Sequence, residues 1–161
     1  MSLTEILLSL AIMIAVVAGV ALGYSQVKSK NDQQRAMQSI QMLRANIEQV
    51  YANGVYTDLS NEVLINAGVV PGELLSGTSD IKTRWGDVTV ASSGDSQYTI
   101  TVSNLDASAC RSIANLSTTS WAEVKVGSET LFDRATNNTV NPANLLAACA
   151  HSANTVVFTG P

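Results

Sequence analysis

The sequence predicts an α+β protein in which the C-terminal half of one long N-terminal helix packs on a small antiparallel β-sheet. An uncharged apolar segment at the N-terminus runs without a break into an amphipathic one. Later segments alternate apolar and polar residues, as half-buried strands do, and helix start signals lie between them. With 161 residues, 46% of them hydrophobic, the chain is long enough for one modest core rather than two full domains.

The first part of the helix has the length and composition of a membrane span. Nineteen residues from Ile6 to Tyr24 carry no charge, and a helix of that length covers about 28 Å. A cleaved signal peptide is the first alternative, but no basic segment precedes the apolar run and no clear Ala-x-Ala site follows it. We therefore expect the segment to be retained in the mature protein.

Two lysines conflict with a plain membrane anchor. Lys28 and Lys30 follow the apolar segment, and the excess of positive charge in cytoplasmic loops would place them, with the large C-terminal part, inside the cell. The conflict disappears if the chain is a mature product and a basic leader once preceded Met1. We therefore predict a processed N-terminus.

The helix is predicted to continue to residue 52. Residues 27–51 contain neither Gly nor Pro, and Asn53-Gly54 provides the stop. Apolar residues recur every three or four positions, which predicts a packed face: Ala36, Ile40, Leu43, Ile47 and Val50, with Met37 and Tyr51 beside them. We divide the chain into a membrane or filament-core half of the helix, 1–25, an amphipathic half, 26–52, and a globular head, 53–161.

Small residues recur along the apolar half at four-residue spacing, so they share one helix face: Ala11, Ala15, Gly19 and Gly23. A row of small side chains lets two helices approach closely. The alternative is that Gly and Ala are simply common in membrane helices. We expect this row to be a surface for helix packing.

The head is predicted to contain four or five strands and three short helices. Alternating patterns predict strands over residues 87–91, 97–103, 121–126 and 154–158, the first two forming a hairpin. Helices are predicted over residues 60–67, from the N-cap Asp106 to Leu116, and from Asn141-Pro142 to Ala150.

Cys110 and Cys149 are the two cysteines of the chain. In an exported protein they suggest one disulfide, the alternative being two free buried thiols. A metal site is not expected, because the chain has one histidine, His151, and no Cys-x-x-Cys spacing.

The sequence offers no enzyme motif. It contains no Gly-x-Ser-x-Gly, no Walker loop and no His-Glu-x-x-His, so we predict no catalytic residues and no cofactor. The net charge is −4 and no basic patch appears, which argues against nucleic-acid binding. Trp85 and Trp121 are expected in the core or in subunit packing rather than in a binding site.

At its N-terminus the chain, MSLTEILLSLAIMIAVVAGV, resembles mature type IV pilins. Met at position 1, the chain size, and the segments ASACRSIANL and NPANLLAACA, which hold the cysteines, are similar to the type IVb branch of bundle-forming, toxin-coregulated and conjugative thin pilins. The resemblance implies the type IV pilin fold, cleavage of a leader by prepilin peptidase, and an N-methylated Met1. Leu22 stands where many type IVa pilins have a helix-kinking proline.

Glu5 is the one acid next to the apolar segment. In a filament built from stacked helices it would lie in an apolar core, where a lone carboxylate needs a cation. We expect the α-amino group of Met1 on a neighbouring subunit to supply it and so to set the axial register, with Thr4 assisting. The alternative is that Glu5 caps the positive end of its own helix.

The resemblance implies a major pilin that polymerises into a type IV pilus used for adhesion, aggregation or conjugative contact. Its partners would be further copies of the chain, the inner membrane before assembly, prepilin peptidase and the pilus assembly machinery. The alternatives are a pseudopilin of a type II secretion system and a membrane-anchored periplasmic binding module. The unassembled subunit is expected in the inner membrane and the assembled one outside the cell.

Overall fold

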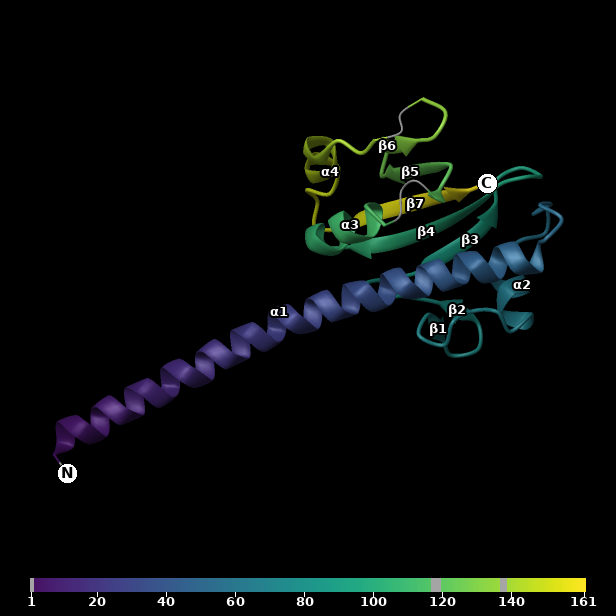
Figure 1. The fold of residues 1–161 in the computed structure, drawn as a ribbon. Coiled ribbons are helices and arrows are strands. Elements are labelled where there is room, and N and C mark those ends of the chain that lie inside the picture. The colour runs from purple at the N-terminus through teal and green to yellow at the C-terminus, as the bar shows by residue number, and fades with distance from the viewer. Residues whose placement is uncertain (1, 117–119, 137–138) are drawn as a thin grey trace. The chain divides into compact units, whose positions relative to one another are not determined.

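The computed structural model describes residues 2–116, 120–136 and 139–161, with the backbone alone for residues 21–27. Helix α1 spans Leu3–Val50 without interruption (Figure 1), which confirms the predicted long helix. Two compact units divide the chain at residues 34 and 35. This division differs from the boundary at 52/53 drawn from the end of the helix, because the second half of α1 packs as part of the head.

The predicted face of α1 enters the core of the head. Ala36, Ile40, Leu43 and Ile47 are at most 8% exposed. Val50, predicted to continue this face, is instead 47% exposed. The core-facing position one turn after Ile47 falls to Tyr51, which packs against the core and contacts Tyr56 with ring centroids 5.5 Å apart.

The segment after α1 folds around helix α2, Asn61–Asn66, which begins at the N-cap Ser60 and ends before Gly68. A two-stranded pair follows, β1 (Leu75–Ser76) with β2 (Asp80–Ile81), which the sequence did not reveal. Side chains of α1 hold this segment: Asn46 Nδ2 donates to Val69 O at 2.7 Å, and Ser39 Oγ donates to Glu73 Oε2 at 3.0 Å.

The main sheet has five antiparallel strands in the order β3-β4-β7-β5-β6 (Figure 1). Their bounds are Val88–Ser92, Tyr98–Leu105, Glu123–Val126, Glu129–Asp133 and Asn154–Gly160 for β3 to β7 in chain order. The predicted hairpin and the last two predicted strands are confirmed. Strand β6 was missed.

One edge of this sheet is covered by a side chain. Asn61, the first residue of α2, donates from Nδ2 to Val88 O at 2.9 Å and accepts at Oδ1 from Val90 N–H at 2.6 Å. The amide thus takes two hydrogen bonds of β3 that a further strand would otherwise form.

A polar network joins α1 to the sheet. Tyr98 Oη donates to Glu48 Oε1 at 2.9 Å, and Arg44 Nε donates to the same oxygen at 2.9 Å. The Arg44 guanidinium also lies 4.6 Å from the ring centroid of buried Trp121. Burial, and then the negative charge of Glu48, raise the pKa of Tyr98, so its hydroxyl remains a donor throughout the physiological range.

Two short helices complete the head. Helix α3, Ala107–Ala114, begins where Asp106 Oδ1 accepts from Ala109 N–H at 2.7 Å. Helix α4, Pro142–Ala148, begins where Asn141 Oδ1 accepts from Ala143 N–H at 2.9 Å. Both starts agree with the predicted caps. Both helices end two residues earlier than predicted, which leaves Cys149 as the C-cap of α4.

The buried face of α1 gives a direct stability test. Leu43→Ala removes a side chain that is 0% exposed, and we expect a loss of about 2–5 kcal/mol in the free energy of unfolding. Val50→Ala is the matched control, with an expected change within about 0.5 kcal/mol. Urea denaturation of the full chain in detergent, followed by tryptophan fluorescence, measures both. Equal effects would contradict the burial assigned to this face.

Candidate functional site

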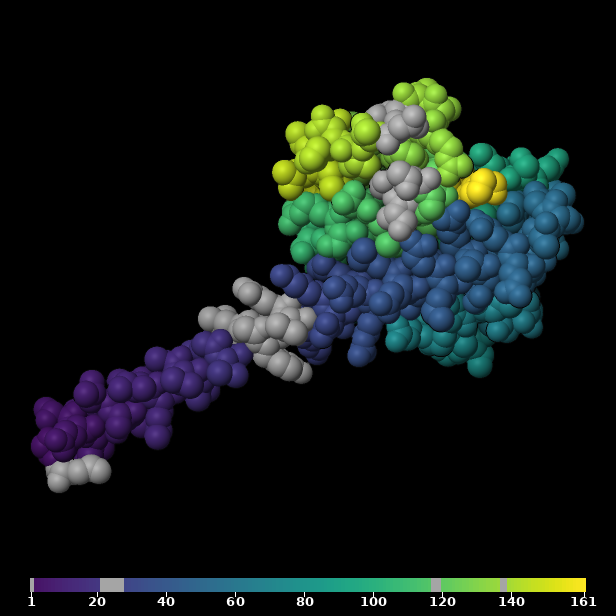
Figure 2. Space-filling view, viewed as in Figure 1, coloured from purple at the N-terminus to yellow at the C-terminus, as the bar shows by residue number. Residues whose placement is uncertain are grey.

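The apolar half of α1 has no partner within its own unit. Every residue from 2 to 20 is exposed, and the stretch Leu3–Val20 has a mean hydropathy of 2.4. Figure 2 shows the side chains of this stretch on the surface of the helix. The largest exposures are those of Leu3 at 75%, Val17 at 68%, and Met13 and Val20 at 67%. An apolar surface of this size marks a contact with lipid or with other protein.

The predicted row of small residues lies on this exposed stretch in part. Ala11, Ala15 and Gly19 are exposed, and a Cβ atom built on Gly19 would meet nothing within 4 Å. Gly23 lies in residues 21–27, where side chains are not described. The row is therefore open to a neighbouring helix, and its role in packing stays a prediction.

The start of α1 is closed by a reciprocal pair of hydrogen bonds. Ser2 Oγ accepts from Glu5 N–H at 3.4 Å, and Glu5 Oε2 accepts from Ser2 N–H at 3.2 Å. This is the capping-box arrangement, in which the N-cap and the third helical residue satisfy each other's backbone donors. Thr4 Oγ1 lies 2.9 Å from Ser2 Oγ. Ser2 was missed by the sequence interpretation, although the spacing Ser-x-x-Glu would have indicated it.

Glu5 therefore caps its own helix, which is the alternative weighed from the sequence. The cap uses Oε2 of an exposed carboxylate, and a carboxylate has about four acceptor positions. Capacity remains for a cation from outside the chain. Met1, the predicted partner on a neighbouring copy, lies outside the described residues, so the Glu5–Met1 pair stays a prediction.

A charged segment follows the apolar one along α1. Lys28 and Lys30 are both exposed. Long basic side chains at this place are suited to the interface between lipid and water, where the apolar stem lies along the bilayer and the ammonium group reaches the water.

In the head, the two cysteines form the predicted disulfide. The S–S distance is 2.05 Å, the Cα atoms lie 5.7 Å apart, and the cysteines are separated by 39 positions in sequence. Both are 0% exposed. The bond joins α3, which contains Cys110, to the end of α4 at Cys149, and closes a long loop that contains β5, β6 and α4. Such a loop gives about 4 kcal/mol of stabilisation in the chain-entropy account.

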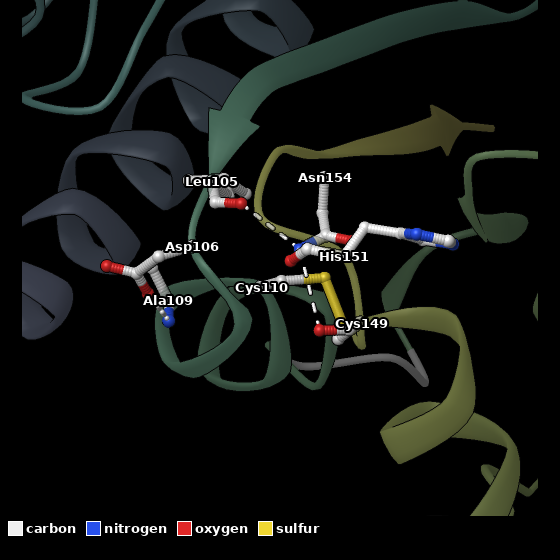
Figure 3. Close-up of a disulfide and its surroundings, with 7 residues drawn as sticks. All are labelled: Leu105, Asp106, Ala109, Cys110, Cys149, His151 and Asn154. Atoms are coloured by element: carbon white, nitrogen blue, oxygen red, sulfur yellow. Dashed lines mark hydrogen bonds between the residues drawn. A yellow bond between two sulfur atoms is a disulfide. The ribbon is translucent and has the colours of Figure 1, made fainter.

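Asn154 holds the same region from the inside (Figure 3). This residue, at the start of β7, is 4% exposed. Its Nδ2 donates to Leu105 O at 3.1 Å, to His151 O at 2.8 Å and, more weakly, to Cys149 O at 3.5 Å. One amide thereby connects the end of β4, the C-cap of α4 and the turn before β7. The sequence carried no signal for this clamp.

The described residues of the head include no arrangement typical of an active site. His151 is exposed and borders an open cavity of about 590 Å³ beside α4. Glu129 and Asn144 also line this cavity. Within the described residues, no group of three His, Cys, Asp or Glu side chains is placed to hold a metal ion. Trp121 is fully buried, and Trp85 is half-buried against the core.

The Asn154 clamp predicts a pH-dependent variant. Asn154→Asp places a carboxylate among three carbonyl oxygens, so its pKa in the folded chain would lie above the unfolded value of about 3.9. The protonated acid can still donate, so the folded state is favoured below that value and penalised as pH rises. We expect a loss near 3 kcal/mol at pH ~7 and a smaller one, about 1 kcal/mol, at pH ~4, where the acid keeps one donor in place of the two of the amide. Exposed Asn144→Asp is the control, and denaturation at both pH values is the measurement. A loss equal at both would contradict the clamp.

The chain is similar to known proteins over most of its length. It is 27% identical over 172 residues to the major structural subunit of bundle-forming pilus from Escherichia coli O111:H-, with 96% of this chain and 89% of that protein covered. Its fold is similar to the crystal structure of a type IV b pilin from Salmonella typhi, with a TM-score of 0.59, 22% identity, and coverage of 76% of this chain and 95% of that chain.

A second solved structure shares the fold. It is TcpA, a type IV pilin from the El Tor biotype of Vibrio cholerae, with a TM-score of 0.57, 15% identity, and coverage of 81% of this chain and 99% of that chain. The family described as PilS N terminal matches residues 30–160, which include the buried face of α1, the sheet and the disulfide. The chain therefore belongs to the PilS N terminal family, and its fold is that of the type IV pilins.

Proposed function

We propose that this chain is the major structural subunit of a type IV pilus, which polymerises by packing of its N-terminal helix into an extracellular filament. The observation that carries the proposal is the stretch Leu3–Val20, apolar and exposed along its whole length. The Escherichia coli relative, the major structural subunit of bundle-forming pilus, supports it. The role is structural rather than catalytic, and the filament serves adhesion, aggregation or conjugative contact.

The unassembled subunit lies in the inner membrane with this stretch among the lipids. Lipid tails are as apolar as Leu and Val side chains, so transfer of the helix from membrane to filament gains little hydrophobic free energy. The position of the helix in the filament is then determined by two interactions. These are close packing along Ala11, Ala15 and Gly19 and the pairing of charges. The assembly machinery supplies the work of extraction.

Glu5 supplies the negative charge of the pair that fixes the helix in the filament. A carboxylate surrounded by hydrocarbon is costly, and the α-amino group of Met1 on a neighbouring subunit offsets that cost. Removal of a leader by prepilin peptidase creates this amino group, and N-methylation leaves it cationic. One axial offset between neighbouring helices satisfies both charges.

The capping box allows the charge of Glu5 to be separated from its capping role. Glu5→Gln keeps a side-chain oxygen for Ser2 N–H but removes the charge, whereas Ser2→Ala removes the cap and keeps the charge. We expect Glu5→Gln to insert normally into the membrane and to form few filaments. Ser2→Ala, whose cap is worth about 1 kcal/mol, should form filaments in nearly normal number. Immunoblots of membranes and electron microscopy of sheared filaments measure the two steps.

The reverse result has a clear meaning. Normal filaments from Glu5→Gln together with few from Ser2→Ala would show that Glu5 acts through the cap alone. Absence of long filaments from cells producing the unaltered chain would instead favour the short piston of a pseudopilin.

Processing gives a separate test. Mass spectrometry of the purified chain should find Met1 as the first residue with one added methyl group, and the mass of the disulfide-bonded form for Cys110 and Cys149. An unmethylated first residue, or a leader still attached, would contradict the proposed route to the filament.

A further inference from the structure

The C-terminal part of the chain contains no Lys, Arg, Asp or Glu. After Arg134, none of the 27 residues to the C-terminus is Lys, Arg, Asp or Glu. The rest of the chain therefore holds all 22 charged residues, 9 basic and 13 acidic. Where such a segment is exposed, its lack of charge resembles the centre of protein interfaces, in which charged residues are depleted.

Helix α4 is the helix of this uncharged segment, and most of its residues are exposed. Its sequence is PANLLAA, and none of these seven residues is buried. Leu146 is 55% exposed. Apolar helices are normally covered. Flexibility does not explain the exposure, because Asn141 caps the start of α4 and the disulfide fixes its end at Cys149. Helix α4 is thus held in place, packs on the core through Leu145 and Ala148, and presents Leu146 outward.

The head also presents an uncharged stripe on α1. Gln38, Met42, Ala45 and Gln49 are exposed and follow one another at four- and three-residue steps, so they share one face. This face is opposite to the buried one of Ile40, Leu43 and Ile47, and Met42 is 60% exposed. Met packs well against partners of irregular shape and is enriched in interfaces.

We propose that α4 of one subunit packs on the α1 stripe of a second copy, with Leu146 against Met42. This inference rests on the proposed filament. The two surfaces match in that their central residues are uncharged, whereas the nearest charges, Arg35 before the stripe and Glu129 beside α4, lie at their margins. The two surfaces also lie on different faces of the head. The sheet and α4 are on one side of the second half of α1 (Figure 1). The stripe is on the side of α1 opposite to its buried residues. A contact between two different patches repeats from copy to copy, and it generates a helical filament when the rotation between copies does not close into a ring.

Chemical cross-linking of filaments tests the contact directly. A chain carrying both Leu146→Cys and Met42→Cys, treated with a short bismaleimide, should give a ladder of dimers, trimers and longer products. Either single variant joins at most two chains, because each copy then has one reactive thiol. A ladder from the double variant together with no dimer from either single variant is specific for the pairing of position 146 with position 42, because 42–42 or 146–146 contacts would cross-link the single variants into dimers. Normal filaments without a ladder from the double variant would overturn the proposal.

A charge placed at the contact gives the second test. Leu146→Glu should lower filament number by about tenfold or more, because it sets an unpaired charge in the middle of an apolar interface. Val55→Glu is the control, since Val55 is 44% exposed in a loop outside both patches. Thermal unfolding of each full chain in detergent shows that the head remains folded. Normal filaments from a folded Leu146→Glu chain would overturn the interface, whereas absence of filaments from the unaltered chain would overturn the proposed function itself.

Discussion

The structure depends on one constraint: the stretch Leu3–Val20 of α1 is apolar enough and long enough to cross a membrane, and all of it is exposed in the single chain. Each fully buried Leu, Ile or Val side chain contributes about 1.5–3 kcal/mol, so leaving this stretch wet would cost on the order of tens of kcal/mol. The helix must be surrounded by lipid or by other helices at every moment. The head, by contrast, has its own core and its own disulfide, so it is able to stay the same while the surroundings of the helix change.

Glu5 shows how one side chain can serve in both surroundings. Its bond to Ser2 N–H satisfies a backbone donor that would be exposed to hydrocarbon in a membrane. The bond occupies part of the carboxylate and leaves the rest for a cation. Glu5 can therefore cap its own helix and pair with a cation of a neighbouring subunit at the same time. The sequence had presented these two roles as alternatives.

Local patterns predicted the parts of the fold that local physics decides. Alternation found β3, β4, β5 and β7, and the caps Asp106 and Asn141 marked two helices. Strand β6 was missed because its apolar pair Leu131–Phe132 is consecutive and both residues are buried. Val50 was misplaced because the 3-4 spacing allows either of two positions at a helix end. The clamp of Asn154 joins carbonyls that are up to 49 residues away, and no local pattern reports such contacts.

A fibre stores its subunits at a local concentration far beyond that of a cell extract, and sheets held so close together are at risk of joining edge to edge. The Asn61 amide, which occupies the outer hydrogen bonds of β3, removes that opportunity at one margin of every head. At this edge, contacts between crowded heads must therefore form through side chains rather than through backbone hydrogen bonds.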